Sequence, residues 1–330
     1  MRATPTVTIG LPVFNGERYL ASAIESILTQ SYGDFELIVS DNASTDATPD
    51  LCAGFAALDD RIKFRRNDVN AGAAANFNQV FRCGRGRYFK WAAHDDVLER
   101  EYLARTVEAL QTAPEAVAAH SFVEFIDEEG HRLHADPFPL HRIGSSRPSE
   151  RFADLILTAH WSFWAFALMR TELLGRTDLI RAYASSDRIL LAHLALLGRF
   201  VEVPEVLFLS RDHPERALKR IPSRLRLGRI LRAVGPLPAA DWYDPAHSGR
   251  IVFPQWNLWR RYLEIVRRAD LEPTERAACR RALGRWFLRN RNAVKLVRDV
   301  ALAAEQWLQR AAARPSAPLA ARSTEKRRLS

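Results

Sequence analysis

The strongest constraint on the fold is a regular alternation of strand-like and helix-like segments in the first third of the chain. Short strand-like segments occupy residues 6–14, 35–41, 61–67 and 87–93. After each segment, apolar residues repeat at helical spacing, in patterns that end near residues 28, 58, 83 and 112. Four strand–helix units in series predict a parallel sheet covered by helices, the doubly wound α/β class.

Polar residues follow three of the predicted strands, at Pro12–Asn15, Asp41–Ser44 and His94–Asp96. Because parallel strands end at the same edge of a sheet, where ligands of this fold class bind, we expect the three groups to converge on one site. The adjacent carboxylates of Asp95 and Asp96 repel each other and are hard oxygen donors for Mg²⁺ or Mn²⁺. Such a metal ion can hold a diphosphate.

Several classes of protein lack support in the sequence. It has no GxxxxGK[ST] motif and no GxGxxG between a strand and a helix, which argues against a P-loop NTPase or a dinucleotide-dependent oxidoreductase. It has no apolar run of about 18 residues that would suggest a membrane span, and its first residues lack the apolar core of a secretory signal. Three widely spaced cysteines fit a reducing compartment. We therefore expect a cytoplasmic protein.

The second half of the chain departs from the regular alternation. Its predicted elements are strands at 116–127, 161–170 and 199–213, a hairpin turn at 127–130 and a capped helix at 185–198. Residues 255–310 are predicted to be largely helical, with a buried face marked by Trp256, Trp259, Leu263 and Val266. From residue 311 onward Ala, Pro, Ser and Arg predominate, which predicts disorder.

Positive charge is concentrated near the C-terminal end. The chain has a formal net charge of +9, and residues 255–330 hold 18 Lys and Arg against 7 Asp and Glu. Such a region can contact nucleic acid or the anionic surface of a membrane, and we expect peripheral contact with the inner face of a membrane and no nucleic-acid partner. The alternative is a solvated basic helix followed by a disordered end.

Three segments together resemble the family 2 glycosyltransferases. Residues 8–46, TIGLPVFNGERYLASAIESILTQSYGDFELIVSDNASTD, are similar to the family's opening, with its P-x-[YF]-N turn, S-[IL]-L-x-Q helix and D-[ND]-x-S-T-D loop. Residues 68–81, DVNAGAAANFNQVF, resemble its asparagine- and glycine-containing segment, and HDD at 94–96 stands where the family carries its D-x-D metal motif. The resemblance covers roughly residues 6–215.

The resemblance implies a GT-A fold, which is a Rossmann-like, mostly parallel sheet flanked by helices, here with a helical C-terminal extension. We expect a GT-A domain over residues 1–215, with a nucleotide-binding half at 1–115 and an acceptor half at 116–215. A mainly helical region at 216–310 and a disordered basic tail at 311–330 would follow.

The resemblance also implies a site for a nucleotide-diphosphate sugar. The residues carried over to this site are Pro12, Phe14, Asn15, Glu17, Asp41, Asn76, Asp95 and Arg211. Among them, Asp41 would accept a hydrogen bond from the nucleobase, Asp95 would contact the ribose or the sugar, and Arg211 would pair with diphosphate oxygens.

By the same resemblance, Asp96 would bind a divalent metal, Mg or Mn, that bridges the diphosphate. His213, at the end of an R-x-H segment, would complete the metal shell. His94 departs from the family, because the first acidic residue of the motif usually stands there. The alternative for Asp96 is structural, since Asp96 and Glu99 together form a capping-box pattern for the following helix.

Two further residues are implied in the transfer step. Asp187 stands in the place of the family's general base, which takes the proton of the acceptor hydroxyl. Alternatively, Asp187 is an acidic first-turn residue favoured by the helix dipole. Trp161, within the stretch His160–Trp164, lies where an acceptor would bind, and its ring could stack on a sugar. The alternative for this stretch is an amphipathic strand packed in the core.

The favoured hypothesis is an inverting, metal-dependent glycosyltransferase of the hexosyltransferase type, acting on a glycan or lipid-linked saccharide. A nucleotidyltransferase that forms sugar nucleotides would need a glycine-rich basic loop after the first strand, where LPVFNGERYL has one Gly and one Arg. An inactive GT-A-like binding protein is the third hypothesis. The presence of Asp41, Asp95, Asp96 and Asp187 disfavours inactivity.

Overall fold

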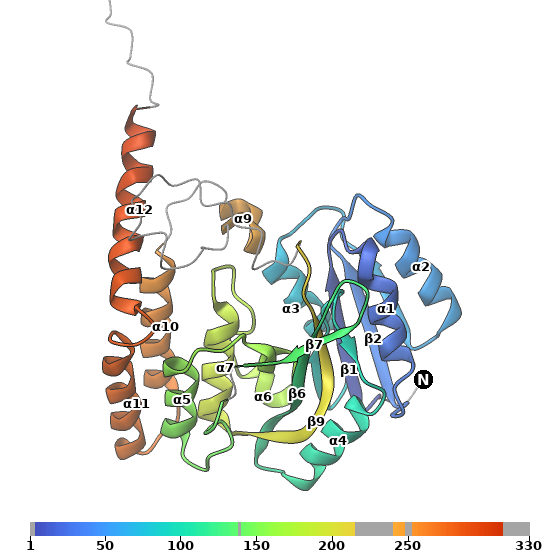
Figure 1. The fold of residues 1–330 in the computed structure, drawn as a ribbon, viewed down its shortest axis with the longest axis horizontal. Helices are drawn as coiled ribbons and strands as arrows, with labels where there is room; N and C mark the ends of the chain where they lie inside the picture. Colours follow the sequence, from blue (N-terminus) through green and yellow to red (C-terminus); the bar gives the residue numbers. More distant parts are fainter. Residues whose placement is uncertain (1–3, 138–139, 215–239, 248–252, 313–330) are drawn as a thin grey trace, which may run out of the picture.

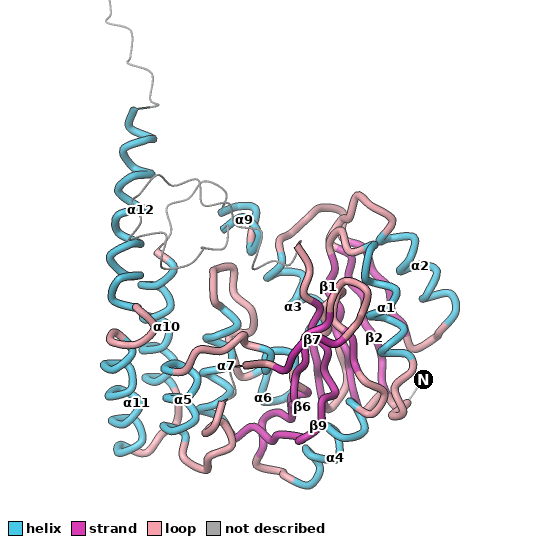
Figure 2. The backbone as a smooth tube through the Cα atoms, in the orientation of Figure 1, coloured by secondary structure: helices cyan, strands magenta, loops and turns pink. Residues whose placement is uncertain are grey.

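The structure is a computed structural model that describes residues 4–137, 140–214, 240–247 and 253–312. Within these residues one sheet lies between two layers of helices, and a further group of helices packs beside them (Figures 1 and 2). In the same part of the chain, no helix combines the length and the apolar character that crossing a bilayer requires.

The predicted strand–helix units form the parallel half of the sheet. Their strands are β1 (Val7–Val13), β2 (Phe35–Asp41), β3 (Ile62–Arg66) and β4 (Tyr88–Trp91). They pair in parallel in the order β3-β2-β1-β4. Every residue of β1, β2 and β4 is buried, as expected for strands that have helices on both faces.

The other half of the sheet is mixed. Its strands are β5 (Val97–Leu98), β6 (Ala116–Ile126), β7 (Arg132–Ala135), β8 (Leu168–Arg170) and β9 (Arg199–Arg211). The long strands β6 and β9 are parallel, while β8 is antiparallel to both β4 and β6 and joins the two halves. The sheet order is β3-β2-β1-β4-β8-β6-β9-β5, with β7 on β6.

Two helical layers cover the two faces of the sheet. One apolar core contains α1 (Glu17–Leu28), α2 (Thr48–Leu58) and α4 (Tyr102–Thr112). A second core contains α3 (Ala73–Cys83), α6 (Thr171–Gly175) and α7 (Ser186–Leu197). Successive side chains of β2 point to opposite faces of the sheet. Leu37 and Val39 lie in the first core, and Ile38 lies in the second.

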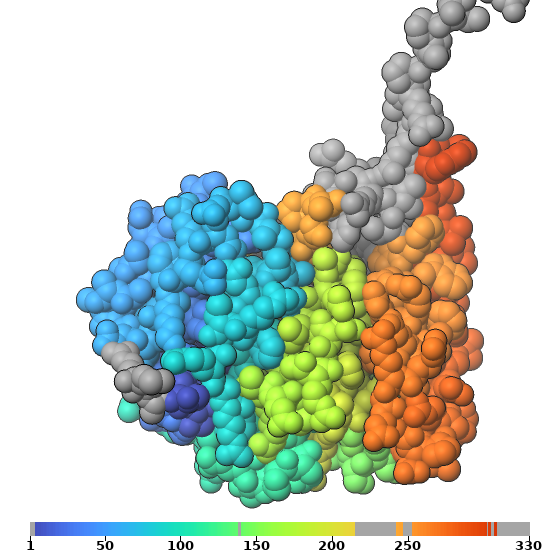
Figure 3. Space-filling model, turned by 180° about the vertical axis from the view of Figure 1, so that it is seen from behind, coloured from blue at the N-terminus to red at the C-terminus, as the bar shows by residue number. Residues whose placement is uncertain are grey.

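The C-terminal helices form a third core with the body of the protein. The helices of this group are α5 (Pro148–Leu157), α10 (Pro254–Arg268), α11 (Pro273–Trp286) and α12 (Asn292–Ala312). Figure 3 shows the C-terminal helices, orange to red, packed against the yellow-green region that contains α7. The predicted helical extension is confirmed over residues 253–312. The predicted tail overlaps the end of α12, and its residues 313–330 lie outside the described part of the chain.

The predicted buried face of α10 is wrong in part. Its buried residues are Leu258, Tyr262, Ile265 and Val266. Trp256 is exposed, and its indole Nε1 donates a hydrogen bond at 3.1 Å to the carbonyl oxygen of Leu296 in α12. Val266 is buried, and Trp259 and Leu263 pack, partly buried, against the third core. The predicted face therefore fails only at Trp256.

Two other local predictions are wrong. Residues 161–170 do not form one strand, because a 3-10 helix, η1 (Phe163–Phe166), precedes the short β8. The helix after the aspartate pair starts at Tyr102 and not near residue 99, because Val97 and Leu98 pair with β9. The capping box of Asp96 and Glu99 is therefore not formed. The α7 helix likewise has no side-chain cap.

Candidate functional site

The three polar groups meet at one edge of the sheet, as the sequence predicted. Val13 pairs with Asp41, and Gly10 pairs with Trp91, so β2 and β4 end on either side of β1. The β1–α1 loop then packs against the segment after β4. A Cβ atom built on Gly16 would lie only 2.6 Å from Cδ2 of His94, so this contact requires glycine.

Asn15 and Glu17 fasten the β1–α1 loop to the β2–α2 loop. The Asn15 N–H donates to Ser44 Oγ at 2.8 Å, and Asn15 Oδ1 accepts from the Thr45 N–H at 2.9 Å. Glu17 Oε2 accepts from the Ala47 N–H at 2.8 Å. These two residues, assigned by resemblance to the nucleotide site, therefore shape the loops that border it.

The other residues assigned near β1 differ in exposure. Pro12 is buried within β1, whereas Phe14 is 40% exposed and presents an aromatic surface. Asn76 is buried in α3, and its Nδ2 donates to the carbonyl oxygen of Ser40 at 2.9 Å. In this structure Asn76 ties α3 to the end of β2.

Asp41 is fully buried at the end of β2. Its Oδ1 accepts from the Ser44 N–H at 3.1 Å, and its Oδ2 lies 3.2 Å from Nε of Arg66. Arg66 also donates to the carbonyl oxygen of Ser44 at 2.9 Å, and its own side chain is about half exposed. Arg66 therefore covers the carboxylate that was expected to meet a nucleobase.

The buried His213 and the partly buried Asp95 form a pair beyond the ends of β4 and β9. His213 Nε2 lies 2.9 Å from Asp95 Oδ2. Burial by itself would raise the pKa of the Asp95 carboxyl, but the hydrogen bond from His213 and the nearby His94 lower the pKa below its ordinary value. Among the described residues, His213 Nδ1 is buried and has no hydrogen-bond partner.

Asp96 and Arg211 are joined to this pair through the backbone. The Arg211 N–H donates to Asp96 Oδ1 at 3.0 Å. The buried Arg211 side chain donates from Nε to the carbonyl oxygen of Asp95, and from one terminal nitrogen to the carbonyl oxygens of Asp127 and Glu128. These bonds hold the Asp95 backbone and the β6–β7 turn in place, so Arg211 is engaged with the protein.

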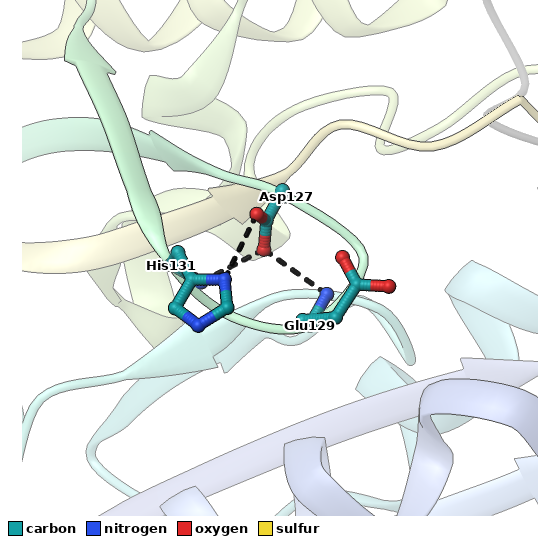
Figure 4. A group of neighbouring side chains, drawn as sticks. All are labelled: Asp127, Glu129 and His131. Carbon is teal, nitrogen blue, oxygen red and sulfur yellow. Dashed lines mark hydrogen bonds and ion pairs between the residues drawn. The ribbon is translucent and has the colours of Figure 1, made fainter.

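The β6–β7 turn contains a further group of metal-ligand side chains, Asp127, Glu129 and His131 (Figure 4). Asp127 Oδ1 accepts from the backbone N–H groups of Glu129 and His131, and its Oδ2 lies 3.1 Å from His131 Nδ1. The two carboxylate oxygens are therefore engaged within a polar turn. These contacts hold the side chains of Asp127 and His131 together, and Glu129 joins them through its backbone N–H.

Tyr19 links the same turn to the Asp95–His213 pair. The Tyr19 hydroxyl donates to Glu128 Oε2 at 3.2 Å. Its ring centroid lies 4.8 Å from the His213 ring and 4.9 Å from the Arg211 guanidinium. The pair is thus enclosed by α1 on one side and by the β6–β7 turn on another.

Lys90 is an unexpected buried charge in β4. Its ammonium donates to the carbonyl oxygen of Phe166 and lies 4.5 Å from the ring centroid of Tyr102. Burial lowers the pKa of Lys90 to about 7, against the opposing influence of the Asp96 carboxylate. Lys90 therefore ties β4, the strand that precedes Asp95 and Asp96, to the carbonyl oxygen at the end of η1.

Asp187 lies half-buried in the first turn of α7, two residues after Ser185, which has a left-handed backbone (φ 63°). Tyr243, at the end of the short helix α9 (Ala240–Tyr243), contacts this turn. The Tyr243 hydroxyl bonds to the backbone of Ser185, and burial together with the charge of Asp187 raises the pKa of Tyr243. The base predicted from the sequence therefore sits beside a C-terminal segment.

The stretch His160–Trp164 presents one exposed ring. Trp161 is 41% exposed, whereas Phe163 and Trp164 are buried. His160 fixes the turn before η1, because its Nδ1 accepts from the Ser162 N–H at 3.1 Å and its Nε2 lies 3.0 Å from the carbonyl oxygen of Leu155. Burial and the nearby Arg188 lower the pKa of His160 to about 3, so the imidazole is neutral.

The comparison with protein families identifies the chain. The sequence pattern described as Glycosyl transferase family 2 matches residues 8–176, about half of the chain. The chain belongs to glycosyl transferase family 2. The match covers β2 to β8 and all of β1 except Val7. It therefore includes the carboxyl end of every strand described above except β9.

Curated proteins named as glycosyltransferases resemble part of the chain. The glycosyltransferase GlyA of Streptococcus pneumoniae is 30% identical over 140 residues, which is 42% of this chain and 19% of GlyA. The putative glycosyltransferase EpsE of Bacillus subtilis is 38% identical over 112 residues, which is 34% of this chain and 40% of EpsE. The matches thus span less than half of either relative.

Solved glycosyltransferase structures share the fold. TarS 1–349 of S. aureus, in complex with UDP, has a TM-score of 0.58 and 16% identity, over 86% of this chain and 72% of that chain. The mannosyltransferase PcManGT of Pyrobaculum calidifontis, in complex with GDP-Man and Mn²⁺, has a TM-score of 0.51 and 19% identity, over 96% and 77%. The predicted fold class is confirmed.

The donor atoms of the candidate site suit a divalent metal. A carboxylate oxygen of Asp95 and an imidazole nitrogen of His213 are both ligands that Mn²⁺ accepts. Their 2.9 Å separation is close to the roughly 3 Å between adjacent ligands of an octahedral ion with bonds of about 2.1 Å. The residues at this edge of the sheet therefore fit such an ion.

Three residues at this candidate site were not identified from the sequence. Arg66 ends the third strand, and a charged residue at a strand's carboxyl end was a usable signal. Tyr19 and Lys90 gave no such signal, because Tyr19 belongs to the pattern of an amphipathic helix and Lys90 lies within an apolar strand pattern. Only the packing of α1 and β4 shows that Tyr19 contacts His213 and that Lys90 lies near Asp96.

Proposed function

We propose that this chain transfers a sugar from a nucleotide-diphosphate donor to a hydroxyl of a glycan or lipid-linked saccharide, with inversion at the anomeric carbon. The observation that carries the proposal is the Asp95–His213 pair at the edge where β1, β2 and β4 end. Family membership supports it, and so do the names of the structural relatives, which include complexes with UDP, UDP-GlcNAc and GDP-Man.

The donor would lie over the interlocked β1–α1 and β2–α2 loops. Phe14 supplies an exposed aromatic surface for the nucleobase, and Arg66 supplies an exposed cation beside the buried Asp41. A nucleobase that reaches Asp41 must displace Arg66 from it. Pro12, Asn15, Glu17 and Asn76 support this surface from within.

A divalent metal, Mg or Mn, would be held by Asp95 and His213, with Asp96 beside them. The resemblance assigned the metal to Asp96, but the contact between Asp95 and His213 favours Asp95 as the partner of the histidine. The imidazole favours Mn²⁺ over Mg²⁺. When bound, such an ion neutralises charge on the diphosphate. Arg211 keeps the Asp95 backbone in position for this role.

Asp187 is the proposed general base. Its carboxylate takes the proton of the acceptor hydroxyl while the hydroxyl oxygen bonds to the anomeric carbon of the donor sugar. The bond from that carbon to the diphosphate oxygen breaks, and its electron pair leaves with the nucleoside diphosphate. Because attack comes from the opposite face, an α-linked donor gives a β-linked product.

The acceptor would approach over Trp161, whose exposed ring can stack on a sugar. We also propose that residues 1–115 bind the donor and 116–215 the acceptor, and that the reaction takes place in the cytoplasm. The three cysteines, Cys52, Cys83 and Cys279, are all free thiols, in keeping with that location.

A thermal-shift panel of nucleotide sugars, with and without Mn²⁺, tests the class of donor directly. We expect one nucleoside diphosphate series to raise the melting temperature, and Mn²⁺ to increase the shift, because a ligand that binds the folded state stabilises it. The absence of any nucleotide-dependent shift would overturn the proposal.

A further inference from the structure

Among the side chains of α12 that the structure describes, the large ones on the outward side are apolar, which reverses the usual arrangement for a surface helix. Its exposed large side chains are Val294, Val297, Val300, Trp307 and Leu308. Its described charged side chains, Lys295, Arg298 and Asp299, are half-buried or buried. We call the five exposed residues the α12 face.

Hydrogen bonds to α10 determine which side of α12 is turned inward. Asp299 Oδ2 accepts from the Gln255 N–H at 2.6 Å, at the start of α10. Asn292 Oδ1 accepts from Gln255 Nε2 at 2.8 Å. Because these hydrogen bonds turn Asn292 and Asp299 toward α10, the residues of the α12 face lie on the outside.

The α12 face is continuous along the helix. Residues 294, 297, 301, 304 and 308 follow one another in steps of three and four, the spacing that aligns side chains on one side of a helix. The two residues of this row outside the α12 face are alanines, Ala301 and Ala304. Val297 and Trp307 are 68% and 62% exposed, so large apolar side chains, and not only the methyl groups of the alanines, form the exposed surface of the α12 face.

The C-terminal part of the chain, which contains the α12 face, is rich in basic residues. Figure 1 shows α12 at the outer edge of the molecule, on the side away from β1 and β2. Residues 253–312 hold 13 Lys and Arg against 6 Asp and Glu, and the chain continues with 5 basic residues and 1 acidic residue in 313–330. Arg281, Arg285 and Arg289, all exposed, lie on α11 and the turn before α12.

We propose that the α12 face docks this protein on a membrane surface that carries anionic phospholipids. An apolar helical stripe beside basic residues suits the boundary between headgroups and acyl chains, where both kinds of contact are satisfied. A symmetric pairing of two copies through this face would instead bring two basic surfaces together, which like charges oppose. The inference does not depend on the glycosyl transfer reaction.

Co-sedimentation of the full chain with vesicles tests the docking. We expect binding to vesicles of phosphatidylglycerol and phosphatidylcholine, little binding to phosphatidylcholine alone, and weaker binding in about 0.5 M salt. Val297→Asp combined with Trp307→Glu should lower the bound fraction about tenfold or more. Leu58→Asp is the matched control, because Leu58 is 87% exposed at the end of α2 in the opposite half of the molecule.

A second variant addresses charge and leaves α12 intact. Arg285→Gln combined with Arg289→Gln should weaken binding to the anionic vesicles several-fold. Melting curves establish that each variant is folded.

The proposal is overturned if the wild type ignores anionic vesicles, or if Leu58→Asp lowers binding as much as the α12 variant does. Unchanged binding in the arginine variant would also overturn it. So would a wild-type dimer, measured by light scattering, that the α12 substitutions convert to a monomer, since the face would then join two copies.

Discussion

His213 Nε2 lies 2.9 Å from Asp95 Oδ2, although 118 residues separate the two in the sequence. β9, which ends just before His213, pairs with β5, which begins just after Asp96. The neighbouring Asp96 is used differently, because it accepts the backbone N–H of Arg211. The two adjacent carboxylates therefore have different partners, and substitutions can separate their roles.

Asp95→Asn is expected to abolish the Mn²⁺-dependent part of nucleotide binding, because it removes the carboxylate charge beside His213. Asp96→Asn should keep the response to Mn²⁺, since its amide oxygen can still accept the Arg211 N–H. Thermal shifts with a nucleoside diphosphate, with and without Mn²⁺, measure both. If Asp96→Asn lost the response to Mn²⁺ and Asp95→Asn kept it, Asp96 would be the metal ligand instead of Asp95.

Asp187→Asn is expected to lower the rate of sugar transfer by about 10²–10⁴-fold, the usual contribution of a general base. Donor binding should be unchanged, because the residue acts on the acceptor. Steady-state transfer rates and a donor thermal shift provide the two measurements. Wild-type turnover in this variant would exclude Asp187 as the base.

Trp161→Ala and Trp164→Ala should have different effects, although the two residues are only three positions apart. Trp161 is exposed, so its loss should raise the acceptor KM with little change in the free energy of unfolding. Trp164 is buried, so its loss should destabilise the fold by about 3–5 kcal/mol. Urea unfolding and acceptor kinetics on both variants test this contrast, and an unchanged acceptor KM in Trp161→Ala would remove the stacking role.

Gly72→Ala should destabilise the contact between the α3 start and the segment that carries Tyr243. Gly72 has φ 83°, and a Cβ there would lie 2.5 Å from the carbonyl oxygen of Tyr243. We expect a loss of about 1–3 kcal/mol in the free energy of unfolding. Gly33→Ala, where a Cβ meets nothing within 4 Å, is the matched control and should change stability by less than about 0.5 kcal/mol. Equal effects would contradict the role of this contact.

Lys90→Met should change how stability depends on pH. The pKa of Lys90 is about 7 in the folded protein and about 10.4 in an unfolded chain, so between these values the unfolded state binds more protons. The contribution of Lys90 to the free energy of unfolding therefore rises with pH from about 7 to about 10, by at most about 1.4 kcal/mol per pH unit. Urea unfolding of both proteins at pH 7 and pH 9 measures the difference, and parallel pH profiles would contradict it.

Much of the parallel half could be predicted because its signals are local. The helical period over residues 73–83 matches α3 residue for residue, and the strands before Asp41 and His94 form as apolar runs. Predictions failed where the partners are distant. The sequence predicts one strand over residues 161–170, but η1 occupies Phe163–Phe166 and only three residues pair in β8.

By itself, the sequence determined that three polar groups would meet at one edge of a sheet, because parallel strands in series must end on the same side. Tertiary structure decided what each group does there. It placed Arg66 over Asp41 and His213 against Asp95, because the ends of β3 and β9 come beside β2 and the segment after β4 only through pairing across the sheet. No pattern within either segment records those pairings.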